Sequence, residues 1–246
     1  MIDLHSHILW AVDDGPPTAS GSLEMARDAV ADGITAVAAT PHVRADYPTR
    51  PDAMERAVEA LRERLHGEGV PLELYPGGEI ALDRLPLLTT DELRRFGLAG
   101  NPAFLLVETP YVGWPAWLPD RVLGLAAAGV TPVLAHPERN REVQGAPERL
   151  APLVDGGTLV QITAASLDGR LGRGTQRCAR TLLDLGLGHV LASDGHERYV
   201  RGIGMSVAAA AVGDETLARW LTAEVPGAIV SGSAVPARPV AAGRRG

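Results

Sequence analysis

The sequence predicts an α/β protein that approaches a (β/α) barrel. Short apolar runs of strand character alternate with helical segments along most of the chain, and this alternation is typical of parallel strands with helices outside them. About seven strands are expected, one fewer than the usual eight of a (β/α) barrel. The 246 residues, 46% of them hydrophobic, suffice for one barrel-sized domain, which we expect over residues 1–230.

Each element can be placed in order along the chain. Strands are expected at 2–4, 34–40, 70–79, 103–108, 130–136, 158–162 and 189–194, with helices at 21–32, 52–66, 118–128 and 174–185. The first helix carries Leu23, Ala26 and Val30 at helical spacing, and Gly33 is a suitable stop. The last segment, 231–246, is rich in small residues, proline and arginine, so we expect a disordered tail there.

The composition argues against several classes of protein. With 23 basic and 30 acidic residues, the net charge of -7 argues against a general nucleic-acid binder or a protein of anionic membranes. No run is apolar and long enough for a membrane helix, and the N-terminal run is too polar for a signal peptide. All basic residues are arginines, which excludes Schiff-base chemistry and Walker-type phosphate binding by lysine. The single cysteine, Cys178, excludes an internal disulfide framework and fits a reducing cytoplasm.

Polar residues that can bind a metal stand where the apolar runs stop. His5 and His7 are expected to point the same way at the end of the first strand, because strand side chains alternate. Further positions of this kind are His42, Glu79, Glu108, His136, Gln161, Asp194 and His196. Barrel enzymes carry their chemistry at this end of the strands. His66 and His189 do not fit the pattern, and we interpret them as a helix-end and a strand-start residue.

Any one of these residues could be an ordinary capping or surface group. As a set they are harder to explain in that way, because several carboxylates gathered without compensation would repel one another and lose their hydration. Bound cations are the expected solution. Mixed oxygen and imidazole ligands favour Mn, Fe or Zn over Ca or Cu.

Six segments occur in an order that is typical of one family: MIDLHSHILWAVDDGP, TPHV, GGE, LLVE, AHPERN and SDGH. On these segments the chain resembles the PHP (polymerase and histidinol phosphatase) superfamily of metal-dependent phosphoesterases. The likeness is greatest to its bacterial protein-tyrosine phosphatases of capsule and exopolysaccharide synthesis. It implies a distorted seven-stranded, TIM-like barrel of the PHP type that holds three divalent metal ions, manganese first, with iron or zinc as alternatives.

The resemblance also implies which residues bind the metals. His5, His7, Glu79 and Asp194 would serve a first metal region, Glu108 and His136 a second, and Asp14, His42 and His196 a third, with one carboxylate bridging two metals. Asp13 is adjacent to Asp14, and the sequence leaves their roles exchangeable, although the family pattern favours Asp14. Asp3 is expected to hold the first strand or to orient a metal-binding histidine.

Two arginines are candidates for binding the phosphate of a substrate. Metal-bound water becomes hydroxide near neutral pH, and the remaining phosphate charge calls for a fork-shaped donor. Arg139 lies three residues after His136, and in the likeness this arginine binds phosphate. Arg201 is the weaker candidate, because its offset from His196 depends on a loop; any single arginine could instead be a solvated surface residue. Asn140 departs from the family's usual motif, in which an aromatic residue follows the arginine. We expect this change to alter the side chains that line the substrate pocket rather than metal binding.

Several other functions compete with a metal-dependent tyrosine phosphatase as the interpretation of this sequence. A cysteine-dependent phosphatase needs an arginine six residues after its cysteine, but Asp184 stands there, and Cys178 shares a helical face with Leu182 and Leu185. A binuclear amidohydrolase often bridges its metals with a carboxylated lysine, which this chain lacks. A metal-stabilised regulatory scaffold attached to a polymerase or kinase is the non-enzymatic alternative. Histidinol-phosphate phosphatase or a nucleotide phosphodiesterase would use the same fold.

The sequence therefore predicts a cytoplasmic, metal-dependent phosphotyrosine phosphatase that regulates exopolysaccharide or capsule synthesis. The expected partner is a phosphotyrosine protein, for example a bacterial tyrosine kinase of polysaccharide export, with no nucleic acid and no membrane insertion. A phenolate, with a pKa of about 10, leaves more readily than an alkoxide, so a site without an obvious separate general acid favours aryl esters.

Overall fold

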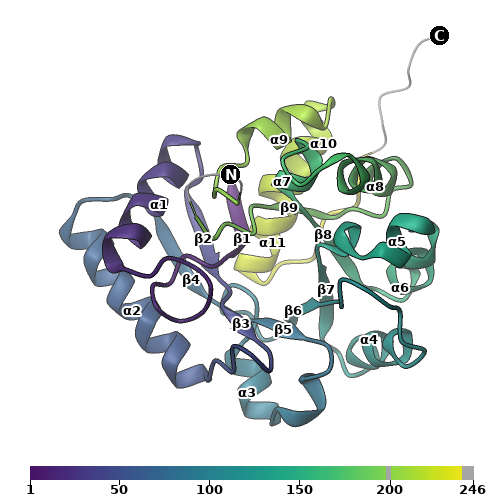
Figure 1. Ribbon diagram of the computed structural model, residues 1–246, viewed down its shortest axis with the longest axis horizontal. Helices are drawn as coiled ribbons and strands as arrows, with labels where there is room; N and C mark the ends of the chain where they lie inside the picture. Colours follow the sequence, from purple (N-terminus) through teal and green to yellow (C-terminus); the bar gives the residue numbers. More distant parts are fainter. Residues whose placement is uncertain (198–200, 240–246) are drawn as a thin grey trace.

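The strands lie at the centre of the computed structural model, with the helices arranged around them (Figure 1). The structure describes residues 1–197 and 201–239. The strands are β1 (Ile2–Ser6), β2 (Ala36–Ala39), β3 (His42–Val43), β4 (Glu73–Pro76), β5 (Glu79–Ala81), β6 (Phe104–Glu108), β7 (Thr131–Ala135), β8 (Leu159–Thr163) and β9 (Val190–Ala192). The helices are α1 (Ala19–Ala31), α2 (Pro51–Gly67), α3 (Thr90–Arg95), α4 (Leu118–Ala127), α5 (Arg141–Gly145), α6 (Ala151–Asp155), α7 (Ala164–Leu167), α8 (Arg173–Asp184), α9 (Ser206–Ala211), α10 (Glu215–Arg219) and α11 (Val225–Ser231).

Neighbouring strands pair in parallel throughout the described ladders, which confirms the predicted α/β class. One sheet has the order β1-β2-β4, and the other has the order β3-β5-β6-β7-β8-β9. Helical chain connects the longer strands, so the crossovers place helices on the outside of both sheets (Figure 1).

The strand count differs from the expected seven, because two predicted strands are interrupted. The run 34–40 ends as β2, and the chain resumes as β3 beyond Pro41, which has no N–H for a ladder. The run 70–79 forms β4, and β5 begins after two glycines. A side chain at Gly78 would put its Cβ 2.6 Å from Phe96 Cδ1, so only glycine fits at this break.

The first and last strands are joined beyond their ends. The N–H of Asp194 donates to the His5 carbonyl at 2.8 Å, and the N–H of His7 donates to the Gly195 carbonyl at 2.8 Å. The Asp3 carboxylate accepts the backbone N–H and the hydroxyl of Ser193 at 2.9 and 2.5 Å, so it holds β1, the first of its two predicted roles. Within residues 1–197 and 201–239, however, the ladders do not close into one seven-stranded sheet.

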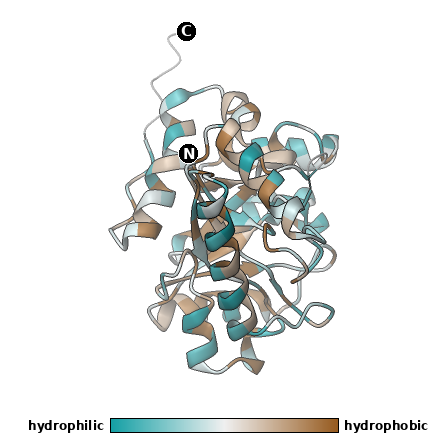
Figure 2. Ribbon diagram, turned by 90° about the vertical axis from the view of Figure 1, so that its left-hand side faces the viewer, coloured by the Kyte–Doolittle hydropathy of each residue, from teal (hydrophilic) through white to brown (hydrophobic). Residues whose placement is uncertain are grey.

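The predicted long helices are present with shifts of one or two residues at their ends. Thr18 caps α1 by accepting the N–H of Gly21, and Gly33 follows this helix with a φ of 85°. Pro51 occupies the first turn of α2, where a missing N–H costs nothing. The helices carry both hydrophilic and hydrophobic residues along their length, as expected for helices that cover a core (Figure 2).

Cys178 lies on the face of α8 that packs against the core, as predicted. The residue is buried with Leu182, and burial raises the pKa of its thiol to about 12. Leu185 was expected on the same face, but it lies just after the last residue of α8 and is 51% exposed. The thiol is therefore a packing group rather than a nucleophile.

The segment after α11 departs from the expected disorder over its described part. The Trp220 indole N–H donates to the Pro236 carbonyl at 3.1 Å, and Arg238 donates to the carbonyls of Gly188 and Leu183 at 2.7 and 2.8 Å. These bonds hold the chain against the start of β9. The remainder of the predicted tail, 240–246, lies outside the described residues. No helix in the described parts of the chain is both long and apolar enough to cross a membrane.

Candidate metal centre

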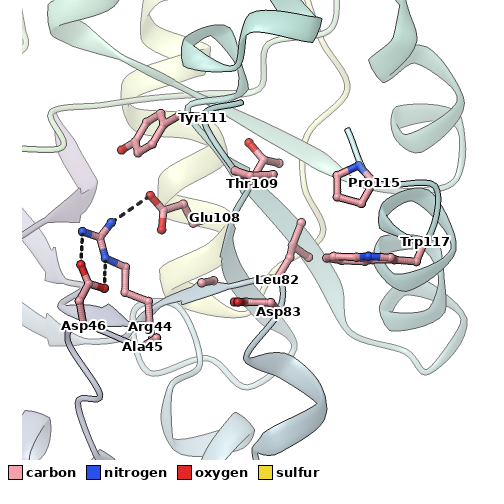
Figure 3. Close-up of a pocket in the computed structure, with 12 residues that line it drawn as sticks. Arg44, Ala45, Asp46, Leu82, Asp83, Glu108, Thr109, Tyr111, Pro115 and Trp117 are labelled. Carbon is pink, nitrogen blue, oxygen red and sulfur yellow. Dashed lines mark hydrogen bonds and ion pairs between the residues drawn. The ribbon is translucent and has the colours of Figure 1, made fainter. Parts of the chain in front are cut away.

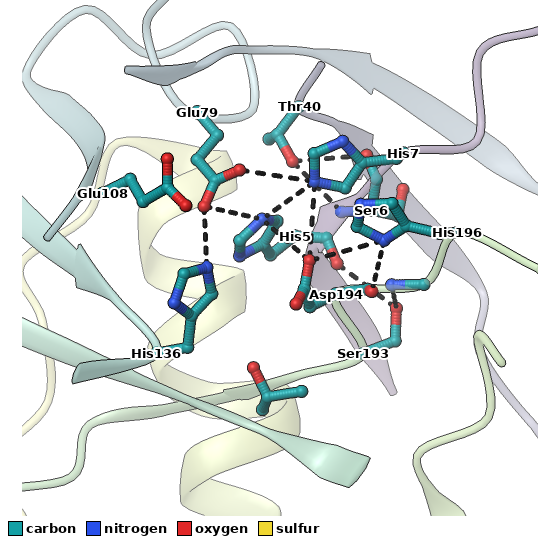
Figure 4. A network of polar contacts seen from close by, with 12 residues as sticks. His5, Ser6, His7, Thr40, Glu79, Glu108, His136, Ser193, Asp194 and His196 are labelled. Atoms are coloured by element: carbon teal, nitrogen blue, oxygen red, sulfur yellow. Dashed lines mark hydrogen bonds and ion pairs between the residues drawn. The ribbon is translucent and has the colours of Figure 1, made fainter. Parts of the chain in front are cut away.

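The residues predicted to bind metal lie together, most of them at or beyond the carboxyl ends of strands, while His42 and Glu79 begin the short strands β3 and β5. Figure 4 shows seven of them. The full set is His5, His7, Asp14, His42, Glu79, Glu108, His136, Asp194 and His196. Eight of them are buried, and Asp14 is exposed. The two strand breaks contribute to this arrangement, because they place His42 and Glu79 opposite each other as the first residues of β3 and β5.

The potential ligand atoms form four overlapping groups, each with its atoms within 4.8 Å of one another. The groups are His7 with Asp14, His42 and His196; His5 with Glu79 and His136; His5 with His7 and Asp194; and His42 with Glu79 and Glu108. The first of these groups contains the three residues expected in the third metal region, Asp14, His42 and His196, together with His7. Glu108 and His136, predicted as one region, fall in different groups that share Glu79.

Glu79 contacts several histidines of the cluster, among them His5, His7 and His136 (Figure 4). Its Oε1 is 2.8 Å from His136 Nε2 and 3.5 Å from His5 Nε2, and its Oε2 is 2.7 Å from His42 Nδ1. Burial opposes its charged form, but the surrounding imidazoles outweigh burial and hold the pKa of this carboxyl well below its usual value. A carboxylate that faces several imidazoles from both oxygens is suited to bridge two cations.

Glu108 is a buried carboxyl group of the cluster whose negative charge is not compensated by the protein alone. Burial, followed by the negative charge of Glu79, raises the pKa of Glu108 to about 8. Two buried carboxylate oxygens, Oε1 of Glu108 and Oδ1 of Asp194, have no hydrogen-bond donor among the described residues. Such groups are costly to bury alone, and metal ions would satisfy them. The residues present therefore fit a site for several cations.

The backbone is strained at two of these positions. His136 has a φ of 35° and Asp194 a φ of 51°, and both are among the few non-glycine residues with positive φ in the described chain. This region is unfavourable for residues with a side chain, and strained residues cluster at functional sites. Here the conformation turns each side chain from the end of a strand into the cluster.

The structure separates the roles of the two neighbouring aspartates. Asp14 Oδ1 lies 3.2 Å from His196 Nε2 and 3.4 Å from His42 Nε2, within one of the ligand groups. Asp13 instead places Oδ2 2.6 Å from His7 Nδ1 and accepts the N–H of His42 at 2.9 Å. Although burial opposes its charged form, contact with Asp13 raises the pKa of His7 well above its usual value. Asp13 thus orients His7, and Asp14 faces the cluster.

Gln161 orients two further residues of the cluster. Its Oε1 accepts the backbone N–H of His136 at 3.0 Å and lies 3.1 Å from His5 Nδ1. Because a carbonyl oxygen only accepts, His5 carries its proton on Nδ1 and turns the lone pair of Nε2 toward Glu79 and Asp194. Burial lowers the pKa of His136 and of His196 to about 4, so both are neutral imidazoles at pH 7.

Both predicted arginines reach the cluster. Arg139 Nη1 lies 2.6 Å from Asp194 Oδ2. Arg201, which the sequence could not place, has Nη2 2.6 Å from His196 Nε2 and Nη1 3.6 Å from Asp14 Oδ2. Two guanidinium groups therefore border the potential metal ligands from different sides, where they can pair with the oxygens of an anion.

Sequence reasoning missed Tyr111 and Arg44. The Tyr111 ring stacks on His136 at 5.8 Å between centroids, and the Arg139 guanidinium lies 4.8 Å from the same ring. Arg44 Nη1 lies 3.6 Å from Glu108 Oε1. Neither residue ends an apolar run, so the signal used for the ligands could not find them.

Glu138 and Asn140 support the turn that carries Arg139. The buried Glu138 carboxylate accepts the N–H of Thr163 at 3.0 Å and the hydroxyl of Ser166 at 2.6 Å, and burial raises its pKa to about 7. Asn140 caps α5 and donates to the carbonyls of Pro110 and Gly113 at 2.6 and 3.0 Å. A polar residue at position 140 therefore holds the loop around Tyr111. His66 lies in the last turn of α2 and His189 just before β9, away from the cluster as predicted.

Comparison with known proteins identifies the family. The family model described as capsular polysaccharide synthesis, CpsB/CapC, matches residues 1–226. The tyrosine-protein phosphatase YwqE of Bacillus subtilis is 39% identical over 203 residues, which are 82% of this chain and 79% of YwqE. The tyrosine-protein phosphatase CpsB of Streptococcus agalactiae is 27% identical over 208 residues, 82% of this chain and 85% of CpsB. A solved structure from work on YwqE and on CpsB of Streptococcus pneumoniae, described as metal-dependent tyrosine phosphatases, matches with a TM-score of 0.86 and 34% identity over 98% of this chain and 99% of that chain. The chain therefore belongs to the CpsB/CapC family of capsular polysaccharide synthesis.

Proposed function

We propose that this protein is a metal-dependent phosphatase that removes phosphate from tyrosine in proteins. The observation that carries the proposal is the convergence of Glu79 with eight other potential metal ligands, bordered by Arg139 and Arg201. The names of YwqE and CpsB as tyrosine-protein phosphatases support the same substrate class.

Three divalent ions are proposed, with manganese preferred and iron or zinc as alternatives. Four overlapping ligand groups of mixed imidazole and carboxylate character support more than one ion. When bound, such ions supply a hydroxide near neutral pH and neutralise the oxygens of phosphate. His5, His42, His136 and their neighbours would hold them, with Glu79 as the shared carboxylate.

The two arginines are proposed to bind and orient the phosphate. Arg139 is held by Asp194 and by the face of Tyr111, so its guanidinium is already directed at the cluster. Arg201 approaches from the side of His196 and Asp14. Fixed donors of this kind stabilise developing negative charge without reorganising during the reaction.

The proposal also includes a barrel architecture, a protein partner and a location in the cell. Counting β2 with β3 and β4 with β5 as interrupted strands would give a distorted seven-stranded barrel of the PHP type, which the bonds between the ends of β1 and β9 support. The proposed partner is a phosphorylated tyrosine kinase of polysaccharide export. A cytoplasmic location is proposed from the single, buried Cys178.

The experiment is a substrate panel with metal-stripped protein reloaded separately with Mn²⁺, Fe²⁺ or Zn²⁺. Phosphotyrosine peptides, an unrelated aryl phosphate and histidinol phosphate are compared under identical metal loading. We expect the highest kcat/KM with phosphotyrosine peptides. A higher kcat/KM for histidinol phosphate than for every peptide would replace this function with the histidine-pathway phosphatase, and no hydrolysis of any ester would favour the regulatory scaffold.

A further inference from the structure

A groove of about 420 Å³ opens beside the metal-binding cluster (Figure 3). Three segments line it, at 44–46, 81–83 and 108–117. At one end, Arg44 lies between Asp46 and Glu108, and at the other end stand Pro115 and Trp117 (Figure 3). The groove therefore runs from a residue of the cluster to an aromatic surface, and its volume falls within the range of ligand-binding pockets.

The groove is continuous with the proposed reaction site through two residues. Glu108 lines the groove and also belongs to a ligand group with His42 and Glu79. Tyr111 lines it while stacking on His136. A substrate whose phosphate is held at the cluster would therefore extend its remaining atoms over Tyr111 and along this groove.

The far end of the groove has the character of a binding surface. Of the residues that line the groove, Trp117 is 41% exposed at this end, and Tyr111 is 38% exposed nearer the cluster. Exposed aromatic side chains that line a groove are typical of interaction sites. The Arg121 guanidinium lies 4.6 Å from the Trp117 ring and donates to the Leu82 carbonyl at 3.2 Å, so the ring is placed before any ligand arrives.

The charges along the groove select against an acidic ligand. Asp46 and Asp83 line it, together with Glu108 at its inner end. Arg44 is the single arginine of the lining, and it is already paired with Asp46 at 2.8 Å and close to Glu108. Arg44 is therefore already occupied and Asp83 would repel an entering carboxylate, whereas an apolar side chain would bury surface against Leu82 and Trp117.

We propose that this groove binds a residue flanking the phosphotyrosine of the protein substrate, and that Trp117 makes it prefer a large apolar side chain over an acidic one. The inference rests on the proposed phosphatase activity and adds the sequence preference of its substrate. Trp117 is a specificity-determining residue in this scheme, remote from the reacting phosphate.

The test compares phosphotyrosine heptapeptides in an alanine background, in which one flanking position at a time carries Leu or Glu. For the wild type we expect at least one position where the Leu peptide has a kcat/KM about tenfold above the Glu peptide, mainly through KM, because partial burial of a leucine supplies that much. In Trp117→Ala this ratio should fall toward one. Leu185→Ala, which removes an exposed leucine outside the groove, is the matched control and should keep the wild-type ratio.

A binding measurement gives a second readout that does not need turnover. A peptide of the preferred sequence with a non-hydrolysable phosphonate analogue of phosphotyrosine is titrated while tryptophan fluorescence is recorded. We expect a fluorescence change in the wild type that is largely lost in Trp117→Phe, since the other tryptophans, Trp10, Trp114 and Trp220, do not line the groove.

The outcomes separate this inference from the function on which it rests. Hydrolysis of all phosphotyrosine peptides with equal kcat/KM, or a Leu preference that survives in Trp117→Ala, would overturn the groove and leave the phosphatase standing. No hydrolysis of any phosphotyrosine peptide by metal-loaded protein would remove both. If Trp117→Ala changed the mass of the protein in solution and not its peptide preference, the groove would be a contact between copies of this chain, and the inference would fail.

Discussion

His136 is buried and His189 is half-buried, and they lie at opposite ends of parallel strands. Burial lowers the pKa of each to about 4, so both are neutral at pH 7. His136 follows β7 and meets the Glu79 carboxylate at 2.8 Å, whereas His189 precedes β9, where its Nδ1 accepts the N–H of Val160 at 3.2 Å and its ring lies 6.0 Å from that of Trp220. A neutral imidazole among carboxylates can bind a cation, but one among backbone and aromatic groups only packs.

The comparison teaches that burial and a lowered pKa do not by themselves identify a functional histidine. What distinguishes the candidate metal centre is the gathering of Glu79, Glu108 and Asp194, because Oε1 of Glu108 and Oδ1 of Asp194 are buried without a donor in the described chain. At the other end, Arg238 donates to the carbonyls of Gly188 and Leu183. His189 and Arg238 are therefore held there by backbone groups, without a ligand.

Metal removal should cause the largest loss of phosphatase activity, through the residues of the cluster alone. Treatment with a chelator is expected to abolish phosphatase activity, because the nine side chains would lose the ions that compensate their carboxylates. Activity should return with Mn²⁺, followed by elemental analysis of bound metal. A preparation free of transition metal that remained fully active would contradict the proposed site.

Single histidine variants sharpen the same contrast. His196→Ala removes a member of the group that contains Asp14, so bound metal and kcat should fall together. His189→Asn removes a half-buried histidine outside the cluster and should leave metal content unchanged. Equal loss of metal in the two variants would mean that stability, rather than ligation, controls metal binding.

Arg139→Ala should lower kcat/KM by about 10²–10³-fold while metal content is retained, because one donor to the developing phosphate charge is lost. Activity against an aryl phosphate and elemental analysis check the two halves of this expectation. Arg219→Ala, at a side chain that is 76% exposed, is the control and should behave as the wild type. An unchanged kcat/KM in Arg139→Ala would assign phosphate binding to another residue.

The other end of the strands should show a pH effect of moderate size. The folded-state pKa of His189 is about 4 against an ordinary value of 6.5, so the unfolded chain binds its proton more readily. Stability is therefore lost as pH falls from 6.5 toward 4, by about 1–2 kcal/mol between pH 7 and pH 5. Denaturant unfolding of wild type and His189→Asn at both pH values measures this contribution, and the variant should lose less stability on acidification. Identical losses would show that His189 is not the responsible group.

Alkylation of Cys178 should give the smallest effect. The thiol is buried and its pKa is raised to about 12, so folded protein should react slowly with iodoacetamide and keep its activity. Mass spectrometry of the modified fraction, followed by an assay, tests this directly. Stoichiometric inactivation would restore the cysteine mechanism.

Most of the candidate ligands could be predicted because they interrupt apolar runs near strand ends, whereas Asp14 was expected only from the family resemblance. Parallel strands bring their carboxyl ends to one edge, so residues as distant in sequence as His5 and Asp194 were expected to meet. Tyr111, Arg44 and Trp117 lie in loops with no such periodic signal, and their neighbours depend on how the loops fold. The groove beside the cluster was therefore not predicted.

Local patterns in the sequence determined the parallel α/β class, the order of the strands and most of the candidate metal ligands, since hydrophobic periodicity and abrupt polar stops are properties of short segments. Tertiary structure alone decided which of these side chains contact one another. Asp13 turns to His7 while Asp14 faces His196 because of the path of one loop, and Glu79 becomes central because β5 starts beside β3. Contacts of this kind depend on distances between segments far apart in the chain, which no single segment encodes.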